Sequence, residues 1–144
     1  MKKNYLLLMA MLLFAVVGFT SCSDDDEGGI SGNPEELLVG DWQAQHDEGY
    51  WVNNGEREEY SEPYTNECYT FESDGTGYCE YLDDGSRYNF TWEVDGNTLY
   101  LEYRTEGDER LVIETLNSGT LVLVYHEVSD NYEEFYRTTY RRLN

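Results

Sequence analysis

Apolar and polar residues alternate in short runs along most of the chain after Gly40. The runs are rich in Tyr, Trp, Val, Ile and Thr, which favour half-buried β-strands. Glycine-containing turn pairs separate the runs, at Asn54-Gly55, Asp74-Gly75, Asp84-Gly85, Asp95-Gly96 and Ser118-Gly119. Such pairs favour hairpins because glycine adopts a positive φ without steric cost. The pattern predicts nine strands in an all-β barrel or sandwich, at 41–52, 56–62, 66–72, 76–82, 86–94, 97–105, 109–116, 119–128 and 131–142.

The alternation also assigns side chains to the two faces of the predicted sheet. One inner face runs through consecutive hairpins and carries Tyr88, Phe90, Trp92, Leu101 and Tyr103. A two-residue turn at 84–85 would pair Tyr81 with Tyr88, Cys79 with Phe90 and Gly77 with Trp92. Small residues would then face large ones, as a curved sheet requires. The run 121–125 is apolar on both faces and is expected to form a central strand or to face a second buried layer.

An acidic, glycine-containing segment precedes the alternating region. Residues 22–36 are expected to form a flexible tether, and residues 37–144 a single domain. The sequence from Pro34 to Val39 predicts one short helical turn where the tether meets the domain. Proline at a helix start and acidic residues in the first turn both favour that turn.

The first segment of the chain has the order of a secretory signal peptide. Two lysines open it, an apolar run follows at 5–19, and the small polar residues Thr20 and Ser21 then precede Cys22. A membrane-spanning helix is the alternative, but crossing a bilayer takes about 20 apolar residues. We therefore expect residues 1–21 to be removed on export.

Removal of this segment would leave a strongly acidic chain without lysine. Seven Arg would face 30 Asp and Glu, a net charge of −23. Such a surface repels nucleic acid and anionic headgroups, so we expect no nucleic-acid partner. Schiff-base catalysis by lysine is excluded as well. The acidity could favour cationic partners or divalent ions, although solubility alone would account for it.

Two cysteines, Cys68 and Cys79, remain besides Cys22. In an exported protein two thiols suggest a disulfide. The alternation places Cys79 inward and turns Cys68 outward, and side chains on opposite faces cannot form a bridge. A two-residue loop between their strands would bring both to one face, so the pairing stays open, with separate thiols favoured.

The stretch 19–22, Phe-Thr-Ser-Cys, resembles the lipobox of bacterial lipoproteins, although leucine is commoner at the first position. This resemblance implies that Cys22 is acylated and becomes the N-terminus of the mature chain. The following residues are similar to the export signal of Bacteroidetes surface lipoproteins, namely Ser23, Asp24, Asp25 and Asp26. The resemblance implies a lipid-anchored protein of the outer membrane that faces the cell surface. A periplasmic location is the alternative, because a solvated acidic run fits either place.

Gly40-Asp41-Trp42, at the start of the first strand, resembles the Gly-x-Trp signature of lipocalins. The stretches 71–77 and 90–99 are similar to the lipocalin-like lipoproteins of Bacteroidetes. The resemblance implies an antiparallel up-and-down β-barrel of about eight strands whose mouth holds a small apolar ligand. It also implies that an arginine of the last strand covers Trp42 and closes one barrel end. We assign this role to Arg141, with Arg142 as the alternative, because alternation turns just one of them inward.

No pattern of catalytic or metal-binding residues accompanies the predicted strands. His46 and His126 are far apart, and the cysteines lack zinc spacing. Nucleophile elbows, phosphate loops and calcium loops are not found either. We therefore expect no enzymatic activity, no metal and no cofactor.

The sequence thus favours a tethered binding module. We expect it to hold a small apolar or amphipathic ligand in the barrel, against Tyr88, Phe90, Trp92, Leu101, Tyr103 and Leu123. The alternative is a structural or protein-interaction lipoprotein, such as an adhesin, a complex subunit or a protease inhibitor. In that case the barrel would be filled, and exposed aromatic residues would contact a surface protein partner.

Overall fold

The computed structural model describes residues 29–144 of the chain. The predicted lipid attachment at Cys22, the export signal and the signal peptide lie outside the described residues. The elements are β1 (Gly29–Ile30), α1 (Pro34–Leu38), β2 (Gly40–Asn53), β3 (Glu56–Pro63), β4 (Glu67–Phe71), β5 (Thr76–Tyr81), β6 (Arg87–Asp95), β7 (Thr98–Tyr103), β8 (Gly107–Leu116), β9 (Thr120–Ser129) and β10 (Tyr132–Arg142). No helix within 29–144 has the length and apolar character that a membrane crossing requires.

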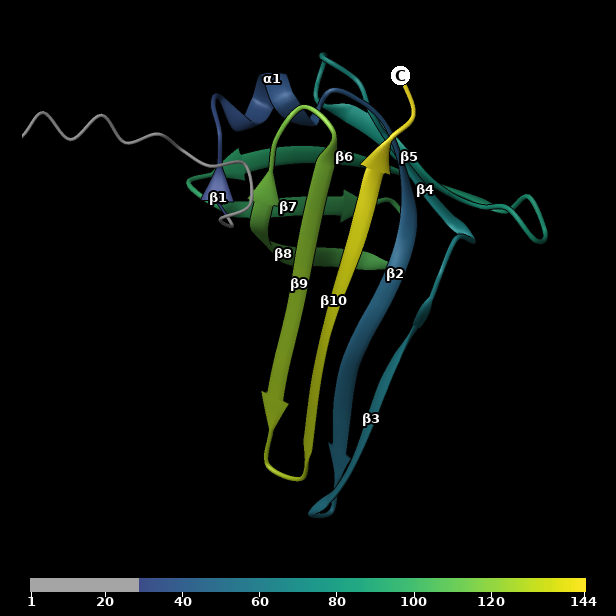
Figure 1. Ribbon diagram of the computed structural model, residues 1–144, viewed down its shortest axis with the longest axis vertical. Helices are drawn as coiled ribbons and strands as arrows, with labels where there is room; N and C mark the ends of the chain where they lie inside the picture. The colour runs from purple at the N-terminus through teal and green to yellow at the C-terminus, as the bar shows by residue number, and fades with distance from the viewer. Residues whose placement is uncertain (1–28) are drawn as a thin grey trace, which may run out of the picture.

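Eight of these strands close into an antiparallel barrel (Figure 1). The order around it is β2, β4, β5, β6, β7, β8, β9 and β10, and β10 pairs with β2 to complete the circle. The predicted fold class is therefore confirmed, as is the short helical turn. All nine predicted strands are present, and their ends differ from prediction by at most two residues.

The last part of the predicted tether contacts the barrel. Gly29 and Ile30 form β1, which pairs with β8 in parallel at Thr115 and Leu116. The sequence offered no signal for this strand, since two residues are too few to show alternation. The chain is therefore attached to the barrel wall before α1 begins.

The hairpin between β5 and β6 differs in register from the prediction. Cys79 pairs with Tyr88 and Gly77 with Phe90, because residues 82–85 all belong to the loop. The Asp84 carboxylate accepts a hydrogen bond from the Ser86 amide at 2.8 Å, an Asx turn that favours the longer loop. The observed register differs from the predicted one by two residues, an even number, so each side chain keeps its predicted face.

The two thiols lie on opposite faces of the sheet. Cys79 is buried in the barrel interior, whereas Cys68 pairs with Glu80 on the outer side. Both are free.

The run 121–125 lies centrally between β8 and β10, as predicted for a strand that is apolar on both faces.

One end of the barrel is closed by α1 and a dense apolar core. Trp42 is fully buried there, and its indole N–H donates a hydrogen bond to the Leu38 carbonyl at 2.8 Å. The guanidinium that covers the indole belongs to Arg142, whose Cζ lies 4.4 Å from the ring centroid. Arg142 also donates hydrogen bonds to the carbonyls of Leu37 and Val39.

The assignment of this role to Arg141 is therefore corrected to Arg142. On β10 the inward positions are 138, 140 and 142, as the burial of Thr138 and Tyr140 shows. Arg142 pairs with Trp42 across the strands, whereas Arg141 pairs with Gln43 and is exposed. Two adjacent arginines cannot be told apart until the parity of the strand is known.

At the other end, β2, β9 and β10 continue beyond the barrel, and β3 pairs with β2 there. β2 pairs with β4 through Gly40–Gln43 and with β3 through His46–Asn53, so it changes partner along its length. We call residues 49–60 and 125–136 the sheet extension; Figure 1 shows these parts of β2, β3, β9 and β10 projecting from the barrel. The Asn54 amide donates a hydrogen bond to the Asn131 carbonyl, which joins the tip of the β2–β3 hairpin to the tip of the β9–β10 hairpin.

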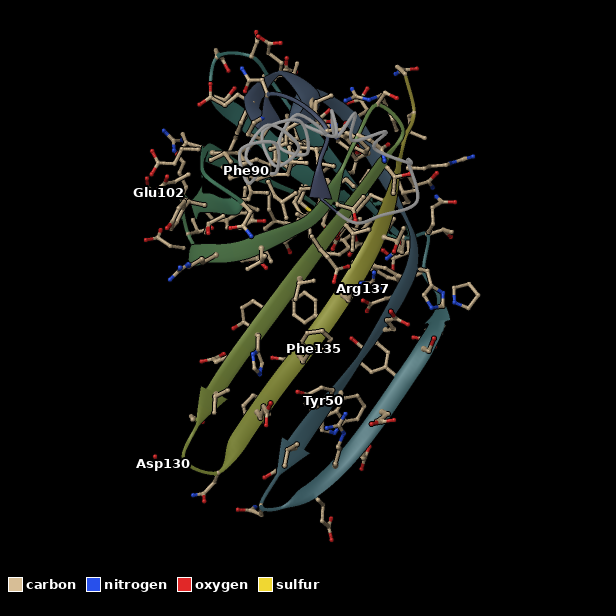
Figure 2. All side chains as sticks on the ribbon, turned by 60° about the vertical axis from the view of Figure 1, so that its left-hand side comes forward. Tyr50, Phe90, Glu102, Asp130, Phe135 and Arg137 are labelled. Carbon is tan, nitrogen blue, oxygen red and sulfur yellow. The ribbon has the colours of Figure 1, made fainter. Side chains whose placement is uncertain are left out.

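Aromatic side chains occupy both faces of the sheet extension. On the outer face Tyr50 stacks on Phe135, with ring centroids 5.4 Å apart (Figure 2). On the opposite face, which continues the barrel interior, Trp51 lies 5.7 Å from Tyr60. This second face leads from solvent to the open end of the barrel.

Candidate functional site

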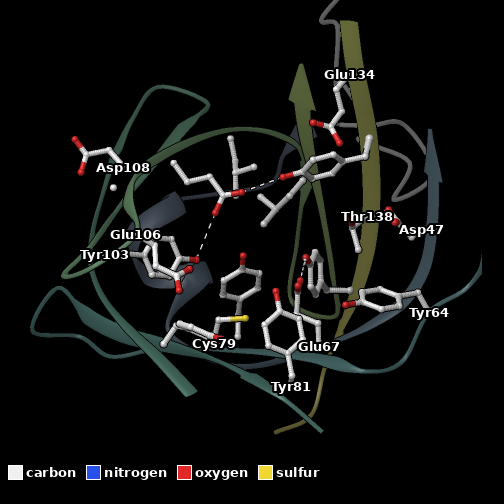
Figure 3. Close-up of a pocket in the computed structure, with 18 of the residues that line it drawn as sticks. Asp47, Tyr64, Glu67, Cys79, Tyr81, Tyr103, Glu106, Asp108, Glu134 and Thr138 are labelled. Carbon is white, nitrogen blue, oxygen red and sulfur yellow. Dashed lines mark hydrogen bonds between the residues drawn. The ribbon is translucent and has the colours of Figure 1, made fainter. Parts of the chain in front are cut away.

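A cavity of about 550 Å³ lies inside the barrel, in the half that adjoins the sheet extension (Figure 3). This volume is in the range of small-molecule pockets. Eight tyrosines line it, namely Tyr60, Tyr64, Tyr69, Tyr81, Tyr88, Tyr103, Tyr136 and Tyr140. Six acidic residues join them, namely Asp47, Glu67, Glu106, Asp108, Glu109 and Glu134. Apolar contact comes mainly from Leu111 and Leu123, so the cavity is acidic and aromatic rather than simply apolar.

Glu67 forms one polar centre of the cavity. It shares the inward parity of Tyr69 and Phe71 on β4, so the alternation that buries those rings also points this carboxyl into the barrel. The Tyr140 hydroxyl donates a hydrogen bond to it at 2.5 Å, and Tyr81 is a second hydrogen-bond partner. Burial raises the pKa of Glu67, and the nearby Glu109 carboxyl raises it further, against the opposing effect of the tyrosine hydrogen bonds.

Glu109 forms the second polar centre, on β8. It shares the inward parity of Leu111 and Ile113. The Tyr136 hydroxyl donates to one carboxylate oxygen at 3.0 Å and the Tyr103 hydroxyl to the other at 3.4 Å, as the dashed lines in Figure 3 show. Burial raises the pKa of Glu109, while both hydrogen bonds lower it.

The tyrosines around these carboxyls pack on one another, in one pair edge to face and in another face to face. The Tyr69 and Tyr140 ring centroids are 5.5 Å apart, and Tyr125 stacks on Tyr136 at 4.8 Å. Burial raises the pKa of Tyr69, Tyr136 and Tyr140, and the neighbouring carboxyls add to this effect. Their hydroxyls therefore stay protonated at neutral pH, and those of Tyr136 and Tyr140 donate hydrogen bonds to Glu109 and Glu67.

The edge of the cavity toward the sheet extension is also polar. The Thr138 hydroxyl, which is buried, donates a hydrogen bond to Asp47 at 2.9 Å. Tyr60 is a second hydrogen-bond partner of Asp47. Desolvation is the main cause that raises the pKa of Asp47. Because Tyr60 also contacts Trp51, this edge joins the cavity to the aromatic face of the extension.

The six residues expected to contact a ligand lie in two places. Tyr88, Tyr103 and Leu123 line the cavity. Phe90 and Leu101 are buried in the core, and Trp92 packs on Phe71 while its indole N–H donates to the carbonyl oxygens of Glu72 and Thr76. This division follows the strand direction, since β6 runs from the cavity toward α1.

The most polar residues of the cavity were missed by sequence reasoning. Glu67 and Glu109 are acidic residues at inward positions of alternating runs, so their inward orientation could be predicted from the sequence. That both line one cavity could not be predicted, because it depends on where β4 and β8 lie around the closed barrel. Within residues 29–144 no group of three or more His, Cys, Asp or Glu is placed to hold a metal ion.

Replacing Glu67 or Glu109 with glutamine is expected to raise the melting temperature at pH 7–8, because the amide has no charge to bury. The folded-state pKa of each carboxyl is raised above its ordinary value of 4.5, so the folded protein binds more protons than the unfolded chain. Their contribution to stability is therefore complete below pH 4.5 and is lost as pH rises through the raised pKa. Melting curves of wild type and variants from pH 4 to 8 should diverge toward high pH.

The matched control for this measurement is Glu93→Gln, which removes an exposed carboxyl on the outer side of β6. Its melting temperature should follow that of the wild type across the pH range. A constant offset between wild type and Glu67→Gln at every pH would contradict the assignment of buried, desolvated carboxyls.

Comparisons with known proteins place the barrel in a family. The family model described as "Lipocalin-like domain" matches residues 38–123. A lipocalin-like protein from Bacteroides uniformis ATCC 8492 is similar in structure, with 17% identity, a TM-score of 0.46 and coverage of 69% of this chain and 96% of that one. An uncharacterized protein from Bacteroides eggerthii DSM 20697 has 11% identity, a TM-score of 0.45 and coverage of 69% and 98%. No curated protein matches the chain significantly. The family match spans more than half of the sequence, so the chain belongs to the lipocalin-like domain family.

Proposed function

We propose that this protein is a non-enzymatic binding module that holds a small amphipathic ligand inside its barrel. The observation that carries the proposal is the open cavity of about 550 Å³ in one half of the barrel. Its walls combine the faces of tyrosine rings with carboxyl groups, so apolar and polar contacts are available side by side.

Of the two ligand classes that the sequence favoured, apolar and amphipathic, the polar centres support the amphipathic one. A wholly apolar ligand would press against Glu67 and Glu109 and remove what water reaches them, which costs free energy without a compensating hydrogen bond. An amphipathic ligand can place its polar group at these carboxyls and its apolar part on Leu111, Leu123 and the tyrosine rings. The second arrangement is the favourable one.

The N-terminal sequence supports a lipid-anchored location for this module. In our proposal Cys22 carries the lipid in the outer membrane, with the barrel at the cell surface; the periplasmic face is the alternative. Six residues separate Cys22 from β1 on the barrel wall. The seven steps from Cys22 to Gly29, at about 3.3–3.6 Å per extended residue, would keep the barrel within roughly 25 Å of the lipid.

Binding is tested with the full chain carrying Cys22→Ala, so that no detergent competes for the cavity. Tryptophan fluorescence against fatty acids, alkyl amines, bile acids and glycans should show a saturable change with at least one amphipathic member. Thr138→Phe, which fills the cavity from β10, should abolish that change. Thr139→Phe on the same strand points away from the cavity and serves as the matched control. Equal binding by the Thr138→Phe variant, or no response to any compound, would refute a ligand role for the cavity.

Anchoring is tested separately by Cys22→Ala in the producing cell. The variant should fold and leave the membrane fraction, because the only acylated residue in the proposal has been removed. Metabolic labelling with a palmitate analogue should mark the wild type and not the variant. A variant that stays labelled and membrane-bound would exclude Cys22 as the attachment site.

The sheet extension favours a second candidate function, contact with a partner protein at the cell surface. It exposes Trp51, Val128 and Tyr132 beyond the barrel, which a small-ligand site alone does not need. Cross-linking on intact cells would test this. A cross-linked partner that is lost with Trp51→Ala and retained with Thr139→Phe would support the candidate, and an unchanged cross-link would exclude the extension as its contact surface.

A further inference from the structure

We propose that the cavity takes an amphipathic organic cation, a ligand with a protonated amine that lies between Glu67 and Glu109 and an apolar part that lies on the tyrosine rings. This inference rests on the proposed function and names the ligand class. It starts from a juxtaposition: two inward carboxyls from β4 and β8 share one cavity, and within residues 29–144 the hydrogen bonds to each come from tyrosine hydroxyls.

The cavity contains acidic groups without a counter-charge. None of the lining residues from the described part of the chain is Arg, Lys or His. Carboxylates are rarely buried unless they are paired with a cation. Here the partners are neutral hydroxyls, so a bound cation would supply the positive charge that the protein itself does not provide.

Four arginines within residues 29–144 are held by carboxylate or aromatic partners outside the cavity. Arg137 bonds to Glu48 and Glu114 on the outer surface, with side-chain distances of 2.8 and 2.5 Å. Arg142 covers Trp42 at the closed end. Arg57 pairs with Glu59 on the sheet extension, and Arg87 pairs with Glu80 on the outside of the barrel.

The hydroxyl donors leave room for a further donor at each carboxylate. An ionised carboxylate has about four acceptor positions. Glu109 receives one hydrogen bond on each oxygen, and Glu67 is bonded by Tyr140 and Tyr81. An ammonium group, which only donates, complements the vacant positions, whereas a carboxylate or phosphate on a ligand would meet acceptor against acceptor.

The tyrosine rings favour the same class of ligand. A cation within about 6 Å of an aromatic face is attracted by the ring quadrupole, and the attraction grows when water is excluded. The chain already uses this contact on its surface, where Arg57 lies 3.7 Å from the Tyr50 ring and Arg87 lies 3.9 Å from the Tyr78 ring. Glu106, Asp108 and Glu134 at the cavity edge would also attract a cation during entry.

The test uses three ligands that share a ten-carbon chain and differ in the end group: decylammonium, decanol and decanoate. Affinities are measured by calorimetry at pH 7 with the full chain carrying Cys22→Ala, below micelle-forming concentrations. We expect decylammonium to bind at least tenfold more tightly than decanol, and decanoate to bind most weakly. Glu67→Gln and Glu109→Gln should each reduce decylammonium affinity by about tenfold and leave decanol affinity unchanged. Glu93→Gln, with the same change in net charge outside the cavity, should change neither.

The outcomes separate this inference from the proposed function. If decanol or decanoate binds as tightly as decylammonium, or if the glutamine variants weaken all three ligands equally, the cation assignment is overturned while the binding function stands. If the three fail and a fatty acid, bile acid or glycan of the broader panel binds and is blocked by Thr138→Phe, the cation assignment is likewise overturned. If no compound binds the wild-type cavity, both proposals are overturned.

Discussion

Replacing Trp42 with alanine is expected to destabilise the barrel by about 3–5 kcal/mol, the usual cost of removing a buried large aromatic side chain. The indole is fully buried, donates a hydrogen bond to the Leu38 carbonyl and supports the Arg142 guanidinium. Its loss would leave a void under α1 and an arginine without its aromatic contact. The loss is a large share of the stability of a domain this size, so denaturant midpoints should fall steeply.

The matched control is Trp51→Ala on the sheet extension. Trp51 is 38% exposed and has one aromatic neighbour, Tyr60. Its removal should cost about 1 kcal/mol or less, the worth of one partly exposed aromatic pair. Equal midpoint shifts for the two variants would show that the closed end does not depend on the indole.

Replacing Gly77 with alanine should destabilise the barrel by about 1–3 kcal/mol, as overpacking of a well-filled interior does. Gly77 lies between Phe71 and Phe90 on the neighbouring strands. A Cβ at this position would overlap the Thr70 carbonyl oxygen and the Phe90 ring. The backbone oxygen cannot move aside without disturbing the pairing of β4 and β5. Thermal unfolding of the variant against the wild type measures this cost.

Gly119→Ala is the control for this substitution. The nearest atom to a Cβ there is the Asn117 side-chain oxygen at 4.0 Å, so the added methyl meets ordinary contact distance. Its effect should stay within about 0.5 kcal/mol, as for most surface changes. A Gly77→Ala variant as stable as Gly119→Ala would mean that Phe90 and β4 adjust at no cost.

The predicted strands and the inner face were correct because both depend on local information. Side chains alternate with a period of two along any strand, so the parity of Tyr69, Phe71, Leu99 and Leu101 could be predicted before any pairing was known. The same rule explains why the two-residue slip between β5 and β6 changed cross-strand partners and left the faces intact. The hydrophobic pattern constrains parity strictly and register only through the turn.

The sequence by itself determined the nine strands β2–β10, their faces and the short helical turn, and the resemblance at Gly40 and Trp42 pointed to the closed end. Only the tertiary structure decided which half of the barrel stays open and that Glu67 and Glu109 both line it, because those facts depend on the order of strands around a closed sheet. It also decided between Arg141 and Arg142, since that choice depends on the parity of β10 at its last residues. Alternation is a property of one strand, whereas a cavity is a property of all eight.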